Sequence, residues 1–308
     1  MECSLSYYLL RWAITIFSSS SDYYLVKLYE YLVKLYELYM KIEVIISAYN
    51  NVCDLQLVLN GYRRQSEPNF SICIADDGSG PEVRDLIDQY TDLNIRHVWQ
   101  EDHGFRKTRI VNNAITTSQA EHIILTDGDC IPSPDFVADH KEMASPDKFT
   151  VGVRVYIKKD ISQRLRNQAL DITALFNILW LLWQSIKKKI SKSEQAIRYP
   201  TWLLPLVTKL KPRMTRFGAN LAMSRTSLCE VNGLDEDYEG WGVEDTDLIW
   251  RLSEYGLTPT GALGRCRQYH LEHKPSEKNT EARAHLMRKQ KAGKIRCLNG
   301  IEKLTGTS

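Results

Sequence analysis

Short apolar runs alternate with amphipathic stretches through the first half of the chain. Residues 42–48, 71–75 and 122–126 are almost continuous apolar runs, a pattern typical of strands buried on both faces of a parallel sheet. The expected elements are strands at residues 42–48, 71–75, 94–99 and 122–126, and helices near residues 52–62, 83–90 and 110–115. This alternation predicts an α/β fold with a doubly wound, mostly parallel sheet and right-handed crossovers.

Polar segments stand at the carboxyl ends of three of these strands. They are Ala48-Tyr-Asn50, Asp76-Asp77 and Asp127-Gly-Asp129. Ligands of such sheets bind beyond the carboxyl ends of the strands, so the three segments are expected to meet at one ligand-binding rim.

Two acidic clusters contain carboxylates that could bind a metal ion or accept a proton. Asp127 and Asp129 provide hard oxygen ligands that suit Mg²⁺ or Mn²⁺ bridging a diphosphate, although Asp and Gly are also ordinary turn residues. Glu244, Asp245 and Asp247 follow a Gly-Trp-Gly turn and begin an amphipathic stretch. One carboxylate would be enough to cap a helix there, and a surplus carboxylate can take a proton from a hydroxyl. Together the clusters indicate a metal-assisted transferase that uses a phosphorylated donor.

With these motifs the chain resembles a family 2 glycosyltransferase of the GT-A type, which has a Rossmann-like sheet with a helical extension on the acceptor side. The C-terminal part resembles the galactosyltransferase-like segment of chondroitin-synthase-like and capsule or lipopolysaccharide enzymes. The resemblance runs from about residue 41 to about residue 279 and includes the segments His103-Gly-Phe-Arg-Lys-Thr-Arg109, Phe217-Gly-Ala-Asn220 and Val231-Asn-Gly-Leu-Asp235.

The resemblance implies roles for the residues of the donor site. Asp76 or Asp77 would contact the uridine of the donor, and the sequence does not assign which. Ala48 and Tyr49 would flank the same base. The diphosphate would lie near an arginine of the segment that opens the third helix, either Arg106 or Arg109, because guanidinium geometry matches phosphate oxygens.

The resemblance also implies the metal and acceptor sites. Asp129 would bind Mn²⁺ or Mg²⁺ directly, and Asp127 would contact the metal or the ribose. His270 would be a further metal ligand, with His273 as its competitor. Asp245 would be the catalytic base and Glu244 would hold acceptor hydroxyls at the catalytic centre. The remaining acceptor contacts are expected from Trp241 and Asp247.

The sequence therefore predicts an inverting glycosyltransferase that moves a sugar from a nucleotide sugar, with UDP as the expected nucleotide, to a saccharide or lipid-linked saccharide. One alternative is a metal-dependent sugar nucleotidyltransferase, which the segment Ser47-Ala-Tyr-Asn-Asn51 disfavours because it is not a Gly-rich phosphate loop. The other is a carbohydrate-binding scaffold without catalysis, which the presence of both acidic clusters disfavours.

Composition argues against several classes of protein, among them nucleic-acid binders, zinc proteins and membrane-spanning proteins. The formal net charge of +2 over 308 residues argues against a dedicated nucleic-acid binder. The seven cysteines contain no CxxC pair, which indicates reduced thiols in a cytosolic protein and no zinc site. The sequence shows no convincing export signal and no apolar stretch of about 20 residues that could span a bilayer.

Four regions are expected along the chain. Residues 1–39 repeat the heptad Tyr-Leu-Val-Lys-Leu-Tyr-Glu and form an extension that we expect to be dispensable. Residues 40–150 form the nucleotide-sugar half, and residues 151–273 form the acceptor-binding and catalytic half with a helical insert at about 160–212. Residues 274–308 are expected to be a solvated basic helical tail.

One segment favours contact with a membrane. Residues 174–183 are apolar and aromatic, too short to cross a bilayer but long enough to lie in its surface, and four lysines follow by residue 192. The alternative is a helix packed into the acceptor half, because apolar residues are normally core. We expect a peripheral protein at the inner, cytoplasmic face of the cytoplasmic membrane.

Overall fold

The structure is a computed structural model that describes residues 40–203, 220–238, 240, 242–274 and 280–303, with a few isolated positions at 24, 27, 28, 31 and 206. Most of the predicted extension at residues 1–39, with its repeated heptad, lies outside the described residues. Among the described residues, no helix combines the length and the apolar character needed to cross a membrane.

The predicted strands and helices of the first half are confirmed, with small shifts of their ends. The strands are β1 (Ile42–Ala48), β2 (Ser71–Asp76), β3 (Ile95–Trp99) and β4 (His122–Asp127). The helices between them are α3 (Val52–Tyr62), α4 (Pro81–Ile87) and α5 (Lys107–Thr117). Strand β2 extends through Asp76 and β4 through Asp127, so the first acidic residue of each rim segment still belongs to its strand.

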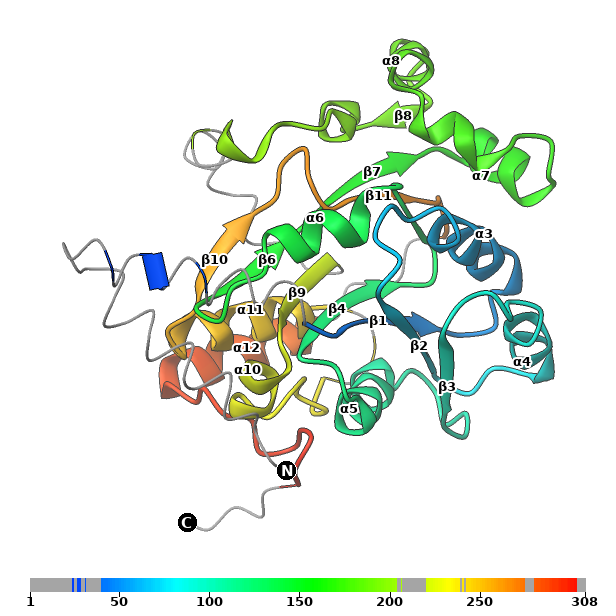
Figure 1. The fold of residues 1–308 in the computed structure, drawn as a ribbon. Coiled ribbons are helices and arrows are strands. Elements are labelled where there is room, and N and C mark those ends of the chain that lie inside the picture. The colour runs from blue at the N-terminus through cyan, green and yellow to red at the C-terminus, as the bar shows by residue number, and fades with distance from the viewer. Residues whose placement is uncertain are drawn as a thin grey trace.

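One seven-stranded sheet organises both halves of the chain, in the order β10-β6-β9-β4-β1-β2-β3 (Figure 1). Strand β9 (Asn220–Ser224) lies antiparallel between β4 and β6 (Lys148–Val151), and β10 (Thr258–Gly261) pairs parallel with β6. The other neighbouring pairs are parallel, which confirms the mostly parallel sheet. Because β9 inserts beside β4, the nucleotide half and the acceptor half share one sheet.

Both faces of this sheet are buried. Along β1, Val44 and Ile46 pack into the core that α3 and α4 cover, whereas Ile45 packs into the core of α5 and the C-terminal helices. Side chains of a strand alternate between its two faces, so an apolar strand without alternation needs cover on both. The continuous apolar runs in the sequence reflect this double burial.

A second, four-stranded sheet forms the other wall of the site, in the order β5-β11-β7-β8. Its strands are β5 (Cys130–Pro132), β11 (Arg267–His270), β7 (Val153–Ile157) and β8 (Ile190–Ser191). Helix α6 (Phe136–Glu142) follows β5. The described part of the expected insert is largely helical, with α7 (Lys159–Arg166), α8 (Ile178–Ile186) and the 3-10 turns Ile172–Phe176, Ser193–Ala196 and Thr201–Leu203.

The C-terminal helices are α10 (Arg225–Glu230), α11 (Glu244–Glu254) and α12 (Thr280–Ala292). Helix α12 lies in the expected basic tail and is mostly exposed, but one side of it is buried. Leu286 and Lys289 are both only 8% exposed, and Nζ of Lys289 lies 2.6 Å from carboxylate oxygens of Asp235 and Asp247. Helix α12 therefore stabilises the position of α11, because Lys289 neutralises the buried carboxylates of Asp235 and Asp247.

Candidate active site

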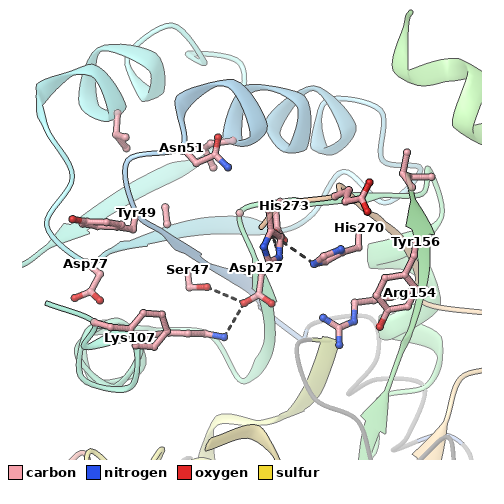
Figure 2. A pocket seen from close by; sticks show the side chains of 18 of the residues that line it. Ser47, Tyr49, Asn51, Asp77, Lys107, Asp127, Arg154, Tyr156, His270 and His273 are labelled. Carbon is pink, nitrogen blue, oxygen red and sulfur yellow. Dashed lines mark hydrogen bonds and ion pairs between the residues drawn. The ribbon is translucent and has the colours of Figure 1, made fainter. Parts of the chain in front are cut away.

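A cavity of about 730 Å³ opens where the carboxyl ends of β1 and β4 meet the second sheet (Figure 2). Parallel strands β1 and β4 end together, which brings Ser47 beside Asp127. The cavity therefore lies at the rim where the sequence predicts a ligand-binding site. The polar and aromatic residues of its lining include Ser47, Tyr49, Asp77, Lys107, Asp127, Asp129, Arg154, Tyr156, Lys158, His270, Glu272 and His273.

The two neighbouring aspartates after β2 have different surroundings. Asp76 is fully buried, accepts a hydrogen bond from the backbone N–H of Ser79 at 2.8 Å and pairs with Nε2 of His97 at 2.9 Å. Burial would raise the pKa of Asp76, but these hydrogen bonds outweigh it and hold the pKa below its usual value. Asp77 lines the cavity and accepts from the backbone N–H of Arg106 at 2.7 Å. Of the pair, only Asp77 can reach a ligand in the cavity.

Asp127 lies at the floor of the cavity in contact with a lysine. Its Oδ1 accepts from the hydroxyl of Ser47 at 3.0 Å and from Nζ of Lys107 at 2.8 Å. Burial opposes the charged carboxylate, but Lys107 outweighs burial and holds the pKa of Asp127 below its ordinary value. Burial alone would lower the pKa of Lys107, but the negative charges of Asp127, Asp245 and Glu244 outweigh burial and raise it, so Lys107 keeps its proton.

Asp129 faces two imidazoles across the cavity. Its Oδ2 lies 3.6 Å from Nε2 of His270 and 3.3 Å from Nε2 of His273. Burial lowers the pKa of His270, which favours the neutral ring that can bind a metal. Ligating atoms of Asp129, Cys130 and His270 lie within 4.8 Å of one another, but burial raises the pKa of the Cys130 thiol and keeps it protonated.

A divalent cation fits this donor set. Asp129 offers a carboxylate and His270 a neutral imidazole, and both side chains line the open cavity. Oxygen ligands suit Mg²⁺ and Mn²⁺, and a nitrogen ligand is acceptable to Mn²⁺. Asp127, which the sequence offered as a second ligand, has Oδ1 engaged by Ser47 and Lys107, so Asp129 is the better placed of the two carboxylates.

Glu244 and Asp245 begin helix α11 on the opposite side of Lys107. Oε1 of Glu244 lies 3.6 Å from Nζ of Lys107, and Asp245 is close enough to raise the pKa values of both Lys107 and Arg154. Burial, together with the charge of Asp245, raises the pKa of Glu244 to about 7. Neither carboxylate belongs to the cavity lining, but both interact with Lys107, and Asp245 also interacts with Arg154, and these two cations line the cavity. Trp241, from which an acceptor contact is expected, lies outside the described residues.

The structure contradicts the expectation that Asp247 contacts the acceptor. The side chain is fully buried, and its Oδ2 accepts from Nε of Arg251 at 2.6 Å, one helical turn later. Its Oδ1 accepts from Nζ of Lys289 at 2.6 Å and from the hydroxyl of Tyr238 at 3.2 Å. Both oxygens are occupied within the core, so Asp247 is a structural residue of α11.

The two arginines that the sequence offered for the diphosphate lie outside the cavity lining. Neither Arg106 nor Arg109 lines the cavity, and Arg109 is exposed at the surface of α5. Arg106 directs its guanidinium to the backbone carbonyl of Glu101. The side chain of Lys107, the first residue of α5, enters the cavity instead (Figure 2).

Arg154 is a further cavity residue that the sequence reasoning missed. Strand β7 alternates buried Val153, Val155 and Ile157 with Arg154 and Tyr156, both of which line the cavity. The Val-Arg-Val-Tyr-Ile pattern carries the signal that could have found it, since alternate residues of a strand share one face. The guanidinium carbon of Arg154 lies 5.8 Å from the centre of the Tyr156 ring.

Comparison with known proteins identifies the family. A sequence profile of glycosyl transferase family 2 matches residues 43–206, more than half of the chain. The chain belongs to glycosyl transferase family 2. A profile of the N-terminal domain of galactosyltransferase matches residues 208–274 of this family 2 chain. The two matches confirm the resemblance stated from the sequence.

This family 2 chain is 28% identical over 261 residues to hyaluronan synthase of Pasteurella multocida, covering 79% of the chain and 26% of the relative. It is 23% identical over 253 residues to chondroitin synthase of Escherichia coli, covering 79% of the chain and 36% of the relative. The chain thus spans only a minor part of the length of either relative.

Among solved structures, GalNAc-T7 with UDP, GalNAc and Mn²⁺ is similar, with a TM-score of 0.57 and 14% identity over 81% of this chain and 48% of that one. At this identity the likeness concerns the fold, and it confirms the predicted GT-A architecture.

Proposed function

We propose that this chain is an inverting glycosyltransferase that moves a sugar from a UDP-sugar to a saccharide or lipid-linked saccharide during synthesis of a cell-surface polysaccharide. One observation carries the proposal: Lys107 contacts Asp127 of the donor rim at 2.8 Å and Glu244 of the second acidic cluster at 3.6 Å. A donor diphosphate at the rim would therefore lie next to carboxylates able to accept a proton. The names of the two synthases support a polysaccharide product.

The donor would lie along the rim from Asp77 to Asp127. Asp77 and Tyr49 line the end of the cavity where the base would bind, and Tyr49 donates to Asp102 at 2.9 Å, which orients its ring. Lys107 and Arg154 are two of the cations that line the cavity, and we assign them to the diphosphate. The UDP in the GalNAc-T7 structure supports uridine as the base.

A divalent cation would be held by Asp129 and His270, with Asp127 nearby. When bound, Mn²⁺ or Mg²⁺ supplies positive charge that favours departure of the nucleoside diphosphate. The Mn²⁺ named for GalNAc-T7 supports this assignment. The side chains of the protein would orient the donor, hold the acceptor and accept one proton.

In the proposed step Asp245 accepts the proton of an acceptor hydroxyl. The hydroxyl oxygen attacks the anomeric carbon while the bond from that carbon to the UDP oxygen breaks, and the electron pair leaves with UDP. A single displacement inverts the anomeric centre and needs no enzyme nucleophile. Glu244, whose pKa of about 7 allows both protonation states near neutral pH, would hold the acceptor hydroxyls.

The direct test is a donor screen. Purified protein would be incubated with Mn²⁺ and UDP-Gal, UDP-GalNAc, UDP-Glc or UDP-GlcNAc, and release of UDP would be measured. We expect UDP release with one donor and its loss with a metal chelator. Pyrophosphate release from a nucleoside triphosphate and a sugar phosphate would identify a nucleotidyltransferase instead, and absence of metal-dependent UDP binding in calorimetry would indicate a scaffold.

The same calorimetry decides between the two histidines. His270→Ala should weaken Mn²⁺-dependent UDP binding by about 10-fold or more, since one of few metal ligands is lost. His273→Ala is the comparison variant, because the side chain of His273 is more exposed than that of His270, at 41% against 15%. A larger effect of His273→Ala would exchange their roles.

The proposed location is the inner, cytoplasmic face of the cytoplasmic membrane, with the protein bound peripherally. A lipid-linked acceptor would be met there. The exposed apolar residues of α8 and the lysines after it support this location.

A further inference from the structure

Helix α8 carries its apolar stripe on the outside of the molecule. The opposite face holds Leu181 and Gln184, which are 1% and 8% exposed. At about 100° per residue, the exposed residues of α8 fall within roughly 140° of the helix circumference and so form one continuous stripe. They are Ile178 (37% exposed), Leu179 (75%), Leu182 (40%), Trp183 (51%) and Ile186 (75%).

An ordinary surface helix is apolar only on the side that faces the core, whereas α8 is apolar on both sides, because Leu181 and Trp180 pack into the core beneath the exposed stripe. Figure 1 shows α8 at the outer edge of the molecule, beyond β8 and α7. Scattered exposed apolar residues are common on proteins, but a rimmed apolar patch marks an interaction surface. The stripe of α8 is such a patch.

The rim of the patch is positively charged. Residues 177–192 contain four lysines and no acidic residue. Lys187 and Lys188 are exposed at the C-terminal end of α8, and Nζ of Lys187 lies 4.4 Å from the centre of the Trp183 ring. Lys189 is paired with Asp160 at 2.5 Å and contributes less. An apolar stripe bordered by cations matches a surface that offers hydrocarbon beneath negative headgroups.

We propose that α8 docks the protein on an anionic lipid bilayer, with the stripe entering the interface and Lys187 and Lys188 contacting headgroups. Trp183 has the aromatic character that favours the interfacial zone. A second copy fits the patch less well. A nine-residue helix is about 14 Å long, and its partly exposed side chains fall short of the roughly 800 Å² per partner that a stable protein interface buries.

The docking surface is connected to the cavity through β7 and β8. Tyr156 of the cavity pairs with Ser191 of β8, and the backbone N–H of Lys158, another cavity residue, donates to the carbonyl of Lys189 at 2.9 Å. Nζ of Lys192 lies 4.6 Å from the centre of the Tyr156 ring. Docking through α8 would thus bring the β7 wall of the cavity towards the bilayer. Delivery of a lipid-linked acceptor along this wall rests on the proposed function, whereas the docking does not.

The test is sedimentation of the full chain with vesicles of phosphatidylcholine alone or mixed with phosphatidylglycerol, at low and high salt. We expect binding only to the phosphatidylglycerol vesicles and release by high salt. Leu179→Ser/Ile186→Ser should weaken binding by at least about tenfold, because two exposed apolar side chains leave the stripe. Lys187→Glu/Lys188→Glu should weaken it by roughly 25-fold or more, since each lysine near the surface contributes about fivefold.

Matched controls lie in α12. Met287→Ser removes one apolar side chain of similar exposure (69%), and Lys291→Glu/Lys294→Glu reverses two exposed lysines at and after the end of that helix. Both should bind vesicles like the wild type. Thermal unfolding and UDP release should be unchanged in all four variants, which separates docking from folding and from activity.

Three results would overturn the proposal. They are failure of the wild type to bind phosphatidylglycerol vesicles at low salt, undiminished binding by the α8 variants, or equal loss in the α12 controls. A wild-type dimer in light scattering that becomes monomeric in Leu179→Ser/Ile186→Ser would show instead that a second copy covers the stripe. If UDP release fails for every donor while vesicle binding behaves as expected, the proposed activity falls and the docking surface stands.

Discussion

Nζ of Lys107 lies 2.8 Å from Oδ1 of Asp127, and the same ammonium is 3.6 Å from Oε1 of Glu244. One cation therefore joins the end of strand β4 to the start of helix α11. Without it, Asp127, Glu244 and Asp245 would confront one another in a partly buried site, where like charges repel strongly. The lysine holds together the two acidic clusters that stand about a hundred residues apart in the sequence.

Replacing this cation tests its role in the reaction. Lys107→Met should lower kcat/KM by about 100-fold or more, because removal of one preorganised positive group from a transition state costs about that much. Lys107→Arg should retain part of the activity. The control is Arg109→Met on the same helix, which should stay close to wild type because Arg109 is exposed and outside the cavity. The reverse ranking of the two variants would restore Arg109 to the donor site.

Asp245 is tested by separating binding from turnover. Asp245→Asn keeps the size of the side chain but cannot accept the proton, so kcat should fall by at least about 100-fold while UDP affinity stays near wild type. Asp237→Asn, an exposed carboxylate before the same helix, is the control. The measurements are steady-state kinetics and calorimetry with UDP. Near-normal turnover of Asp245→Asn would remove Asp245 from the mechanism.

The ligand-binding rim could be predicted because β1, β2 and β4 run in the same direction through the sheet. Parallel strands that alternate with helices must end at the same edge, so the positions after residues 48, 76 and 127 were bound to converge. The choice between Asp76 and Asp77 could not be made, because it depends on His97, which pairs with Asp76 from β3. That contact needs the register of two strands, which composition and periodicity do not provide.

The differences between the predicted and the observed site residues have similar causes. Lys107 and Arg109 are two residues apart and thus about 200° apart around a helix, so only the phase of α5 decides which one enters the cavity. Asp247 and Arg251 stand four positions apart, a spacing that allows an ion pair along a helix. The burial of this pair could not be predicted, because Lys289 approaches it from a helix 42 residues later.

Asp247 is expected to matter for stability. Asp247→Asn leaves Arg251 and Lys289 as buried cations with fewer partners, so the free energy of unfolding should fall by about 3–5 kcal/mol. Lys289→Met should cost a comparable amount, and the double variant should cost less than the sum because the residues are in contact. Urea unfolding measures all three, with Asp237→Asn as the control. If Asp247→Asn unfolds like the wild type and only the acceptor KM rises, the original acceptor assignment of Asp247 was right.

Two buried histidines should make the fold sensitive to acid. Burial, reinforced by His140, lowers the pKa of His122 to about 3, and burial lowers that of His140 to about 4. Both rings stay neutral in the folded protein, whereas in the unfolded chain they bind protons below their ordinary pKa of about 6.5. The unfolded state therefore binds more protons between about pH 6.5 and pH 4, and stability is lost as the pH falls through this range. Each histidine contributes a slope of up to about 1.4 kcal/mol per pH unit.

The test compares the slopes of two variants with the wild type. His122→Leu removes a ring whose Nε2 has no hydrogen-bond partner among the described residues, so it should fold well and reduce the acid slope by about one proton. His103→Gln changes an exposed ring and should keep the wild-type slope. Free energies of unfolding from urea titrations at a series of pH values give both slopes. An identical slope in His122→Leu and the wild type would mean that other groups, such as the lowered-pKa ring of His270, govern the acid response.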